Sequence, residues 1–131
     1  MVIDSSALLA ILFREAEADS FTAAVVATPR RLVGAPSLLE TAMVTIGRLG
    51  PTGRGLAERL IGSIAADIMA FTERQANRAV EAFLRYGKGR HRANLNFGGC
   101  CSYALAAETG LPLLIKGNDF AETDIRPAPA L

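Results

Sequence analysis

The stretch Met1-Val2-Ile3-Asp4-Ser5-Ser6 opens the chain with a short apolar run that ends in an acid, directly before a helical pattern. Further short apolar runs follow along the chain, and helical patterns separate them. Short buried strands that alternate with helices predict a mainly parallel sheet covered on both faces. We therefore predict an α/β protein, a three-layer α/β/α domain with a mainly parallel central sheet, and a single domain over residues 1–131.

Apolar periodicity and chain breakers predict the other elements. The pair Thr72 and Gln75 matches a capping box at the start of a helix, and Gly110 matches the residue that ends one. We expect strands at 32–33, 68–71 and 113–115 with a last one at Ile125, and helices over 5–13, 16–27, 36–46, 56–64, 72–86 and 97–109.

Composition excludes several classes of protein. Half of the 131 residues are hydrophobic and 21% are charged, which excludes a disordered chain. The net charge of +1 does not by itself predict a nucleic-acid binder. The adjacent Cys100 and Cys101 make a poor disulfide and, with His91, too few ligands for zinc. Without a signal peptide or a long apolar run, we expect a cytoplasmic protein that has no contact with a membrane.

Three acids follow predicted strands. Asp4 comes after the first of them, Asp119 comes after the strand at 113–115, and Glu40 lies one turn into the helix after the strand at 32–33. The carboxyl ends of parallel strands meet at one edge, so these carboxylates predict a crevice that binds Mg²⁺ or Mn²⁺. Each acid also has a structural interpretation: Asp4 as a helix cap, Glu40 in a capping box with Ser37, and Asp119 in an Asn-Asp turn.

A basic loop follows the fifth predicted helix. It carries Lys88, Arg90, His91 and Arg92 around two glycines, and these side chains are candidates for binding RNA phosphates and bases. The alternative is a solvated loop. It is not a P-loop, because the Gly-x-x-x-x-Gly-Lys-Ser/Thr pattern is missing.

Several motifs, in order along the whole chain, resemble VapC-type toxins of the PIN-domain ribonuclease family, of the actinobacterial type. The combination of Gly87-Lys88-Gly89-Arg90-His91-Arg92-Ala93 with Leu95-Asn96-Phe97-Gly98 is the most specific part. The others are the opening Ile3-Asp4-Ser5-Ser6-Ala7, Ser37-Leu38-Leu39-Glu40, Lys116-Gly117-Asn118-Asp119-Phe120 and Thr123-Asp124-Ile125.

The resemblance implies a PIN-like fold and a Mg²⁺-dependent endoribonuclease, the toxin of a type II toxin–antitoxin pair. It implies a small VapB-type antitoxin as partner, RNA as substrate, and operator DNA bound only through the antitoxin. Asp4, Glu40 and Asp119 match the family's catalytic and metal-binding acids. Ser6 matches the residue that orients the metal cluster, and Asn118 lies where a polar or acidic residue is common.

Gly99 departs from the family pattern. It stands at the metal-ligand position where the resemblance implies an acid, and it has no oxygen to offer. We interpret Gly99 as an inactivating change, with a natural degenerate member as the alternative. The second function is then a non-catalytic PIN-like binding module that only binds its antitoxin. Apolar positions on the first helices also suggest a homodimer.

Overall fold

The computed structural model describes residues 1–129 and shows one four-stranded parallel sheet. The strand order is β3-β2-β1-β4, and every neighbouring pair runs parallel. The predicted last strand at Ile125 is wrong, because the chain only touches the sheet there through a single bridge between Leu113 and Pro127. The strands are β1 (Val2–Ile3), β2 (Leu32–Gly34), β3 (Asp67–Met69) and β4 (Leu113–Leu114).

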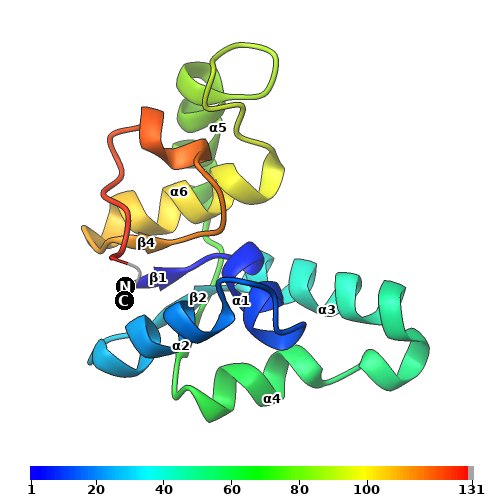
Figure 1. The fold of residues 1–131 in the computed structure, drawn as a ribbon. Helices are drawn as coiled ribbons and strands as arrows, with labels where there is room; N and C mark the ends of the chain where they lie inside the picture. The colour runs from blue at the N-terminus through cyan, green and yellow to red at the C-terminus, as the bar shows by residue number, and fades with distance from the viewer. Residues whose placement is uncertain (130–131) are drawn as a thin grey trace.

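Helices cover both faces of the sheet, as predicted. Figure 1 shows α5 and α6 on one side of the strands and α1, α2 and α4 on the other. Two short 3-10 turns, η1 (Gly50–Gly53) and η2 (Asp119–Glu122), complete the elements. The helices are α1 (Ser5–Leu12), α2 (Ala18–Ala27), α3 (Ala35–Leu49), α4 (Leu56–Ser63), α5 (Glu73–Tyr86) and α6 (Phe97–Thr109).

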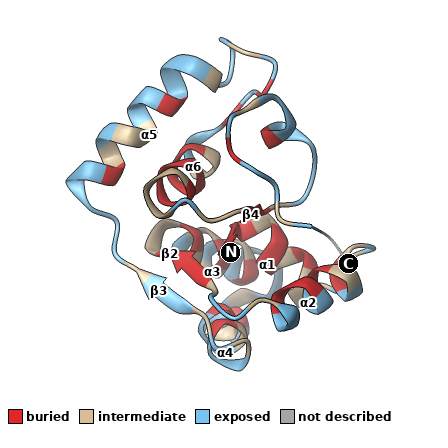
Figure 2. Cartoon of the chain, turned by 90° about the vertical axis from the view of Figure 1, so that its left-hand side faces the viewer, coloured by how far each residue is buried: buried red, intermediate tan, exposed pale blue. Residues whose placement is uncertain are grey.

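The two faces of the sheet are built by alternate strand residues. Val2, Leu32 and Leu113 belong to the core that contains α6, whereas Ile3, Val33 and Leu114 belong to the core beneath α1 and α2. Side chains alternate between the faces of a strand, so β1, β2 and β4 each contribute to both cores, whereas β3 adds only Met69 to the first. Figure 2 shows the consequence: α6 is largely buried, while α5 is mostly exposed.

Local signals fix several helix ends. The Thr72 hydroxyl accepts a hydrogen bond from the Gln75 amide at 3.2 Å and begins α5, although the Gln75 side chain binds Glu108 instead of closing the capping box. Gly110 ends α6 at φ +66°, a conformation that glycine adopts at low cost. No helix in the described part of the chain is both long and apolar enough to span a bilayer.

Candidate active site

A cleft of about 180 Å³ lies where β1 and β4 end and where α1 and α6 begin. Asp4, Glu40 and Asp119 all line it, together with Gly99 and Ser6. The sequence therefore placed the three acids correctly at one edge of the sheet. The parallel strands cause this, because their carboxyl ends open on the same side.

Asp4 is buried at the bottom of the cleft and receives hydrogen bonds on both carboxylate oxygens. Its Oδ2 accepts from the Ser6 amide at 2.8 Å and from the Ser6 hydroxyl at 2.6 Å, and its Oδ1 accepts from the Ser102 hydroxyl at 2.5 Å. Asp4 does cap α1, as the structural interpretation predicted. The third bond comes from a distant helix, so capping is not the whole role of this carboxylate.

Ser102 was not found by the sequence reasoning. It is buried in the middle of α6, and its hydroxyl also lies 3.3 Å from the hydroxyl of Ser37 in α3. The other seven residues from Cys100 to Ala107 are all hydrophobic. A buried polar side chain needs a hydrogen-bond partner. A single serine in a hydrophobic run was therefore the signal that could have identified Ser102.

Glu40 does not close a capping box with Ser37, so that interpretation is wrong. The helix begins earlier, at Ala35, and Ser37 lies inside its first turn. Instead, Glu40 Oε2 accepts a hydrogen bond from the Ser5 hydroxyl at 2.6 Å. The carboxylate also lies against Gly98, where an added Cβ would come within 2.6 Å of the same oxygen.

Asp119 lies at the first position of η2, is exposed and reaches the cleft from the segment after β4. Asn118 precedes it, is exposed and does not line the cleft. The same segment is anchored by Lys116, whose amide donates to the Ser6 hydroxyl at 3.0 Å. Its ammonium group donates to Glu15 at 2.6 Å and lies 3.2 Å from Glu17, and these bonds raise the pKa of Lys116.

Gly99 lies in the first turn of α6 with its amide bonded to the Asn96 side chain at 2.8 Å. A Cβ added there would lie 3.3 Å from Asn96 Oδ1 and 3.5 Å from Leu95 Cδ2. The first contact is tight and the second ordinary, so a side chain fits after a small shift. Position 99 therefore faces the cleft and has room for a residue other than glycine.

The carboxylates of the cleft are not drawn together into one tight cluster. Among residues 1–129, no group of three or more Asp, Glu, His or Cys side chains is close enough to hold a metal ion. Asp4, Glu40 and Asp119 supply oxygens of the kind that hard cations prefer. Asp4, Glu40 and Asp119 share one cleft and are the residues that would hold a Mg²⁺ or Mn²⁺ ion there.

The basic loop does not reach the cleft. None of Lys88, Arg90, His91 and Arg92 lines it. Arg92 forms an ion pair with Glu122, the Arg90 guanidinium lies 5.8 Å from the Phe83 ring centre, and His91 Nδ1 accepts a hydrogen bond from the Ala93 amide. Three of the four side chains thus hold local structure, and RNA binding by this loop stays a prediction.

The two cysteines are free and largely buried, and both line an apolar pocket between α5 and α6. Burial raises the pKa of Cys100, and burial with the nearby Cys100, Glu40 and Asp4 raises the pKa of Cys101 to about 11. Both thiols therefore stay protonated at neutral pH. They are poor nucleophiles and poor metal ligands in this state.

The family model, the relatives found by sequence and the solved structures all point to the same family. The PIN domain model matches residues 1–126. Ribonuclease VapC30 of Mycobacterium tuberculosis is 49% identical over 125 residues, 95% of both chains. Ribonuclease VapC of Mycolicibacterium smegmatis is 46% identical over 95% of this chain and 97% of its own.

Two solved structures share the fold at low sequence identity. M. tuberculosis VapC20, a Sarcin-Ricin loop cleaving toxin, superposes with a TM-score of 0.76 at 18% identity, over 96% of this chain and 98% of its own. A toxin–antitoxin complex from Klebsiella pneumoniae superposes with a TM-score of 0.68 at 17% identity, over 94% and 92%. The chain therefore belongs to the PIN-domain family, among its VapC-type ribonuclease toxins.

Proposed function

We propose that this chain is the toxin of a toxin–antitoxin pair, built as a Mg²⁺- or Mn²⁺-dependent endoribonuclease whose ligand set lacks one carboxylate. The observation that carries the proposal is the position of Gly99. It lines the same cleft as Asp4, Glu40 and Asp119, has room for a side chain, and lies where no group of three ligands forms. As it stands, the chain should cleave RNA weakly or not at all.

The remaining residues are arranged for a charged cleft. Ser6 and Ser102 fix both oxygens of Asp4, and Ser5 fixes one oxygen of Glu40. Such fixed orientation removes the need to reorder the carboxylates when a cation or a phosphate arrives. The missing component is an oxygen ligand at position 99.

The test is Gly99→Asp, compared with Gly62→Asp as a control in α4, where an added Cβ meets nothing within 4 Å. Both proteins are incubated with a panel of structured RNAs in Mg²⁺ or Mn²⁺, with a chelator as the negative arm. Gly99→Asp should raise the cleavage rate by roughly 10² to 10³, the usual effect of one preorganised charged group. Equal cleavage by both variants and the parent would show that position 99 is not a ligand position.

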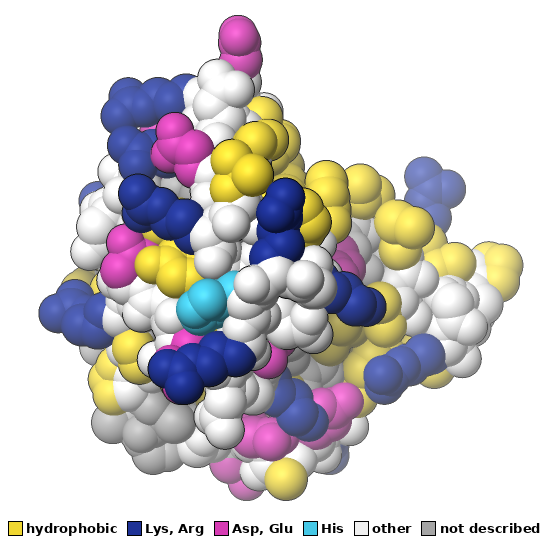
Figure 3. All heavy atoms as spheres, turned by 90° about the horizontal axis from the view of Figure 1, so that it is seen from above, with side chains coloured by type: hydrophobic (Ala, Val, Ile, Leu, Met, Phe, Trp, Pro, Cys, Tyr) yellow, Lys and Arg dark blue, Asp and Glu magenta, His cyan; other side chains and the backbone are white. Residues whose placement is uncertain are grey.

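A second candidate function, the antitoxin-binding module, is favoured by an apolar groove between α3, α5 and α6. Phe97 is 79% exposed there, Met43 64% and Val80 60%. Figure 3 shows hydrophobic side chains gathered along the right-hand side of the top face. Exposed apolar patches of this kind mark interaction surfaces.

The occupant we propose is an amphipathic segment of the antitoxin. Glu40 lines both the groove and the cleft, so a segment in the groove can place a basic residue against Glu40 and Asp4. Met43→Glu should therefore release a co-expressed antitoxin from a pull-down, whereas Val26→Glu, at an exposed position on α2, should not. Retention of the antitoxin by Met43→Glu would contradict this groove as the binding surface.

The homodimer and the link to operator DNA through the antitoxin stay predictions. The apolar positions on the first helices that suggested a dimer are mainly buried: Leu8 and Phe21 belong to the core. Val26 is the one large apolar side chain of α1 and α2 that is clearly exposed. The free cysteines fit a reducing compartment, and we expect the cytoplasm.

A further inference from the structure

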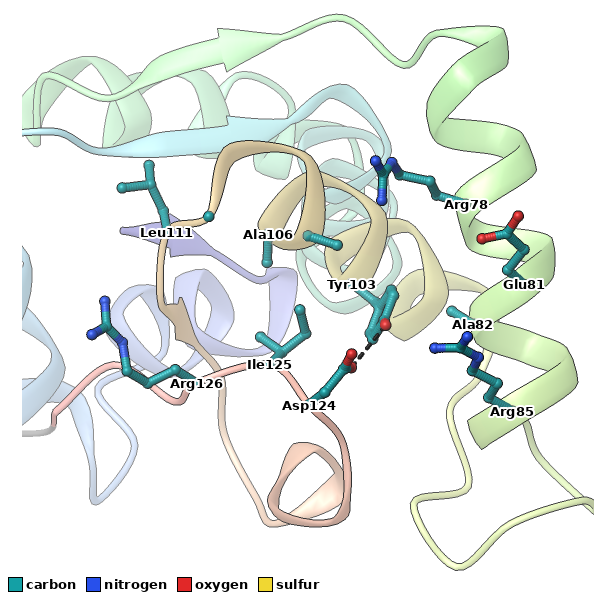
Figure 4. A pocket seen from close by; sticks show the side chains of 12 residues that line it. Arg78, Glu81, Ala82, Arg85, Tyr103, Ala106, Leu111, Asp124, Ile125 and Arg126 are labelled. Carbon is teal, nitrogen blue, oxygen red and sulfur yellow. Dashed lines mark hydrogen bonds between the residues drawn. The ribbon is translucent and has the colours of Figure 1, made fainter.

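A second cavity, of about 650 Å³, lies between α5, α6 and the segment that follows η2 (Figure 4). It shares no lining residue with the acidic cleft. Its floor includes Ala82, Ala106 and Ile125, which are buried and mostly small. A ligand can therefore approach closely, and the charged side chains of the rim decide which kind of ligand fits.

The arginines of this rim have no carboxylate partner in the described residues 1–129. Neither Arg78 nor Arg85 on α5, nor Arg126 after η2, forms a salt bridge there. By contrast, Arg74, one turn before Arg78, pairs with Glu108 at 3.5 Å. The rim thus holds positive charge that the protein does not neutralise by direct pairing.

One of the two acids of the cavity already has a hydrogen-bond partner. Asp124 Oδ1 accepts a hydrogen bond from the Tyr103 hydroxyl at 2.8 Å, shown by the dashed line in Figure 4. Glu81 is the other acid of the rim, so the rim as a whole keeps an excess of positive charge. Both carboxylates can also accept hydrogen bonds from hydroxyl groups on a ligand.

Arg78 and Arg85 offer two separate points of contact. They lie seven residues apart on α5, which is two turns or about 10 Å along the helix. Figure 4 shows both side chains reaching from α5 toward α6 and the C-terminal segment. This spacing lets each guanidinium contact a different anionic group of one ligand.

We propose that this cavity binds a ligand that carries two or more phosphate groups, with Arg78 and Arg85 on different phosphates. The planar guanidinium fork matches phosphate oxygens in pairs, which makes arginine the preferred residue for this chemistry. Glu81 and Asp124 then receive ribose hydroxyls. Linked phosphates and ribose occur both in a nucleoside diphosphate and in an RNA strand, and binding measurements separate these two sources.

The experiment compares the parent chain with the double variant Arg78→Gln/Arg85→Gln. The matched control is Arg54→Gln/Arg59→Gln, which removes the same charge at the start of α4, across the sheet from the cavity. Affinities for ADP, for inorganic phosphate and for a single-stranded RNA of about ten nucleotides are measured by calorimetry. A chelator is present throughout, so no cleavage or metal bridging contributes.

The cavity variant should bind ADP or the RNA at least about tenfold more weakly than the parent and the control. For RNA, the slope of log affinity against log salt should fall by about 1.4, because two phosphate contacts are lost. Inorganic phosphate should bind far more weakly than ADP.

Loss of ADP binding in the cavity variant identifies a free nucleotide as the ligand, and loss confined to RNA identifies the strand. Equal affinities in all three proteins, or no binding of either ADP or RNA to the parent, would overturn the proposal. No arm measures cleavage, so failure here is distinct from failure of the ribonuclease proposal.

Discussion

Replacing Ser102 with Ala should destabilise the protein by about 2 kcal/mol at neutral pH. The Ser102 hydroxyl donates to Asp4 Oδ1 at 2.5 Å, and both residues are buried. A hydrogen bond to a charged group contributes about 1.5–3 kcal/mol, and its loss leaves a buried carboxylate oxygen without that donor. The substitution also removes the Ser102 partner of the buried Ser37 hydroxyl, which lies 3.3 Å away, so the loss should fall within this range.

The assay is urea unfolding of Ser102→Ala, Asp4→Ala and the double variant. The difference between the double variant and the sum of the single variants isolates the interaction between the two side chains. We expect a coupling free energy of about 1–2 kcal/mol. Ser63→Ala is the control, because Ser63 is exposed and bonds only to a carbonyl of its own helix; it should change stability by less than about 0.5 kcal/mol.

A coupling free energy below about 0.5 kcal/mol would refute the reasoning, since distant independent sites show no more than this. It would mean that Ser102 does not hold Asp4 in solution. The arrangement of the cleft would then depend on the Ser6 contacts alone. If Ser63→Ala lowered the free energy of unfolding as much as Ser102→Ala does, the loss in Ser102→Ala could not be assigned to its bond with Asp4.

Gly98→Ala should be about 1–2 kcal/mol less stable than Gly47→Ala, because its Cβ would lie 2.6 Å from Glu40 Oε2 and displace that carboxylate. A Cβ added at Gly47 meets open space, so Gly47→Ala is the control. Urea unfolding compares the two variants, and equal stabilities would contradict the prediction. Burial raises the pKa of Tyr103 to about 12. The raised pKa stabilises the fold fully below pH 10, the ordinary tyrosine value, and this contribution is lost as the pH rises from about 10 to 12. The stability difference between the parent and Tyr103→Phe should shrink across that window in unfolding curves, and a difference independent of pH would argue against it.

The sequence predicted the fold well where local patterns and global packing agree. β1 and β2 are recognisable because each is an apolar run followed by a helix, and α6 is found with both ends correct. Its start has an Asn96 cap and its end a left-handed Gly110, and both are strong local signals. The predicted strand at Ile125 failed because one apolar residue cannot show whether the chain pairs along its length or at a single point.

Strand topology predicted which acids share the cleft, but not the hydrogen bonds that hold them. Topology brings Asp4, Glu40 and Asp119 to one edge, but it says nothing about which hydroxyl binds which carboxylate. The partners of the first two acids, Ser102 and Ser5, depend on how α6 and α1 pack across the sheet. The positive charge of the basic loop is visible in the sequence, but the ion pair between Arg92 and Glu122 is not, because it depends on how the loop packs against η2.

The order around Asp4 bears on the effect that we propose for Gly99. Hydroxyls from α1 and α6 hold Asp4, and one from α1 holds Glu40, and none of these bonds involves the side chain at position 99. The Gly99 amide is bonded to Asn96, a contact that any residue except proline keeps. The fold and the orientation of the acids therefore do not require a carboxylate at this position. Under the proposed function, the absence of an acid at position 99 affects only the ligand set, and one substitution should be enough to complete the cleft.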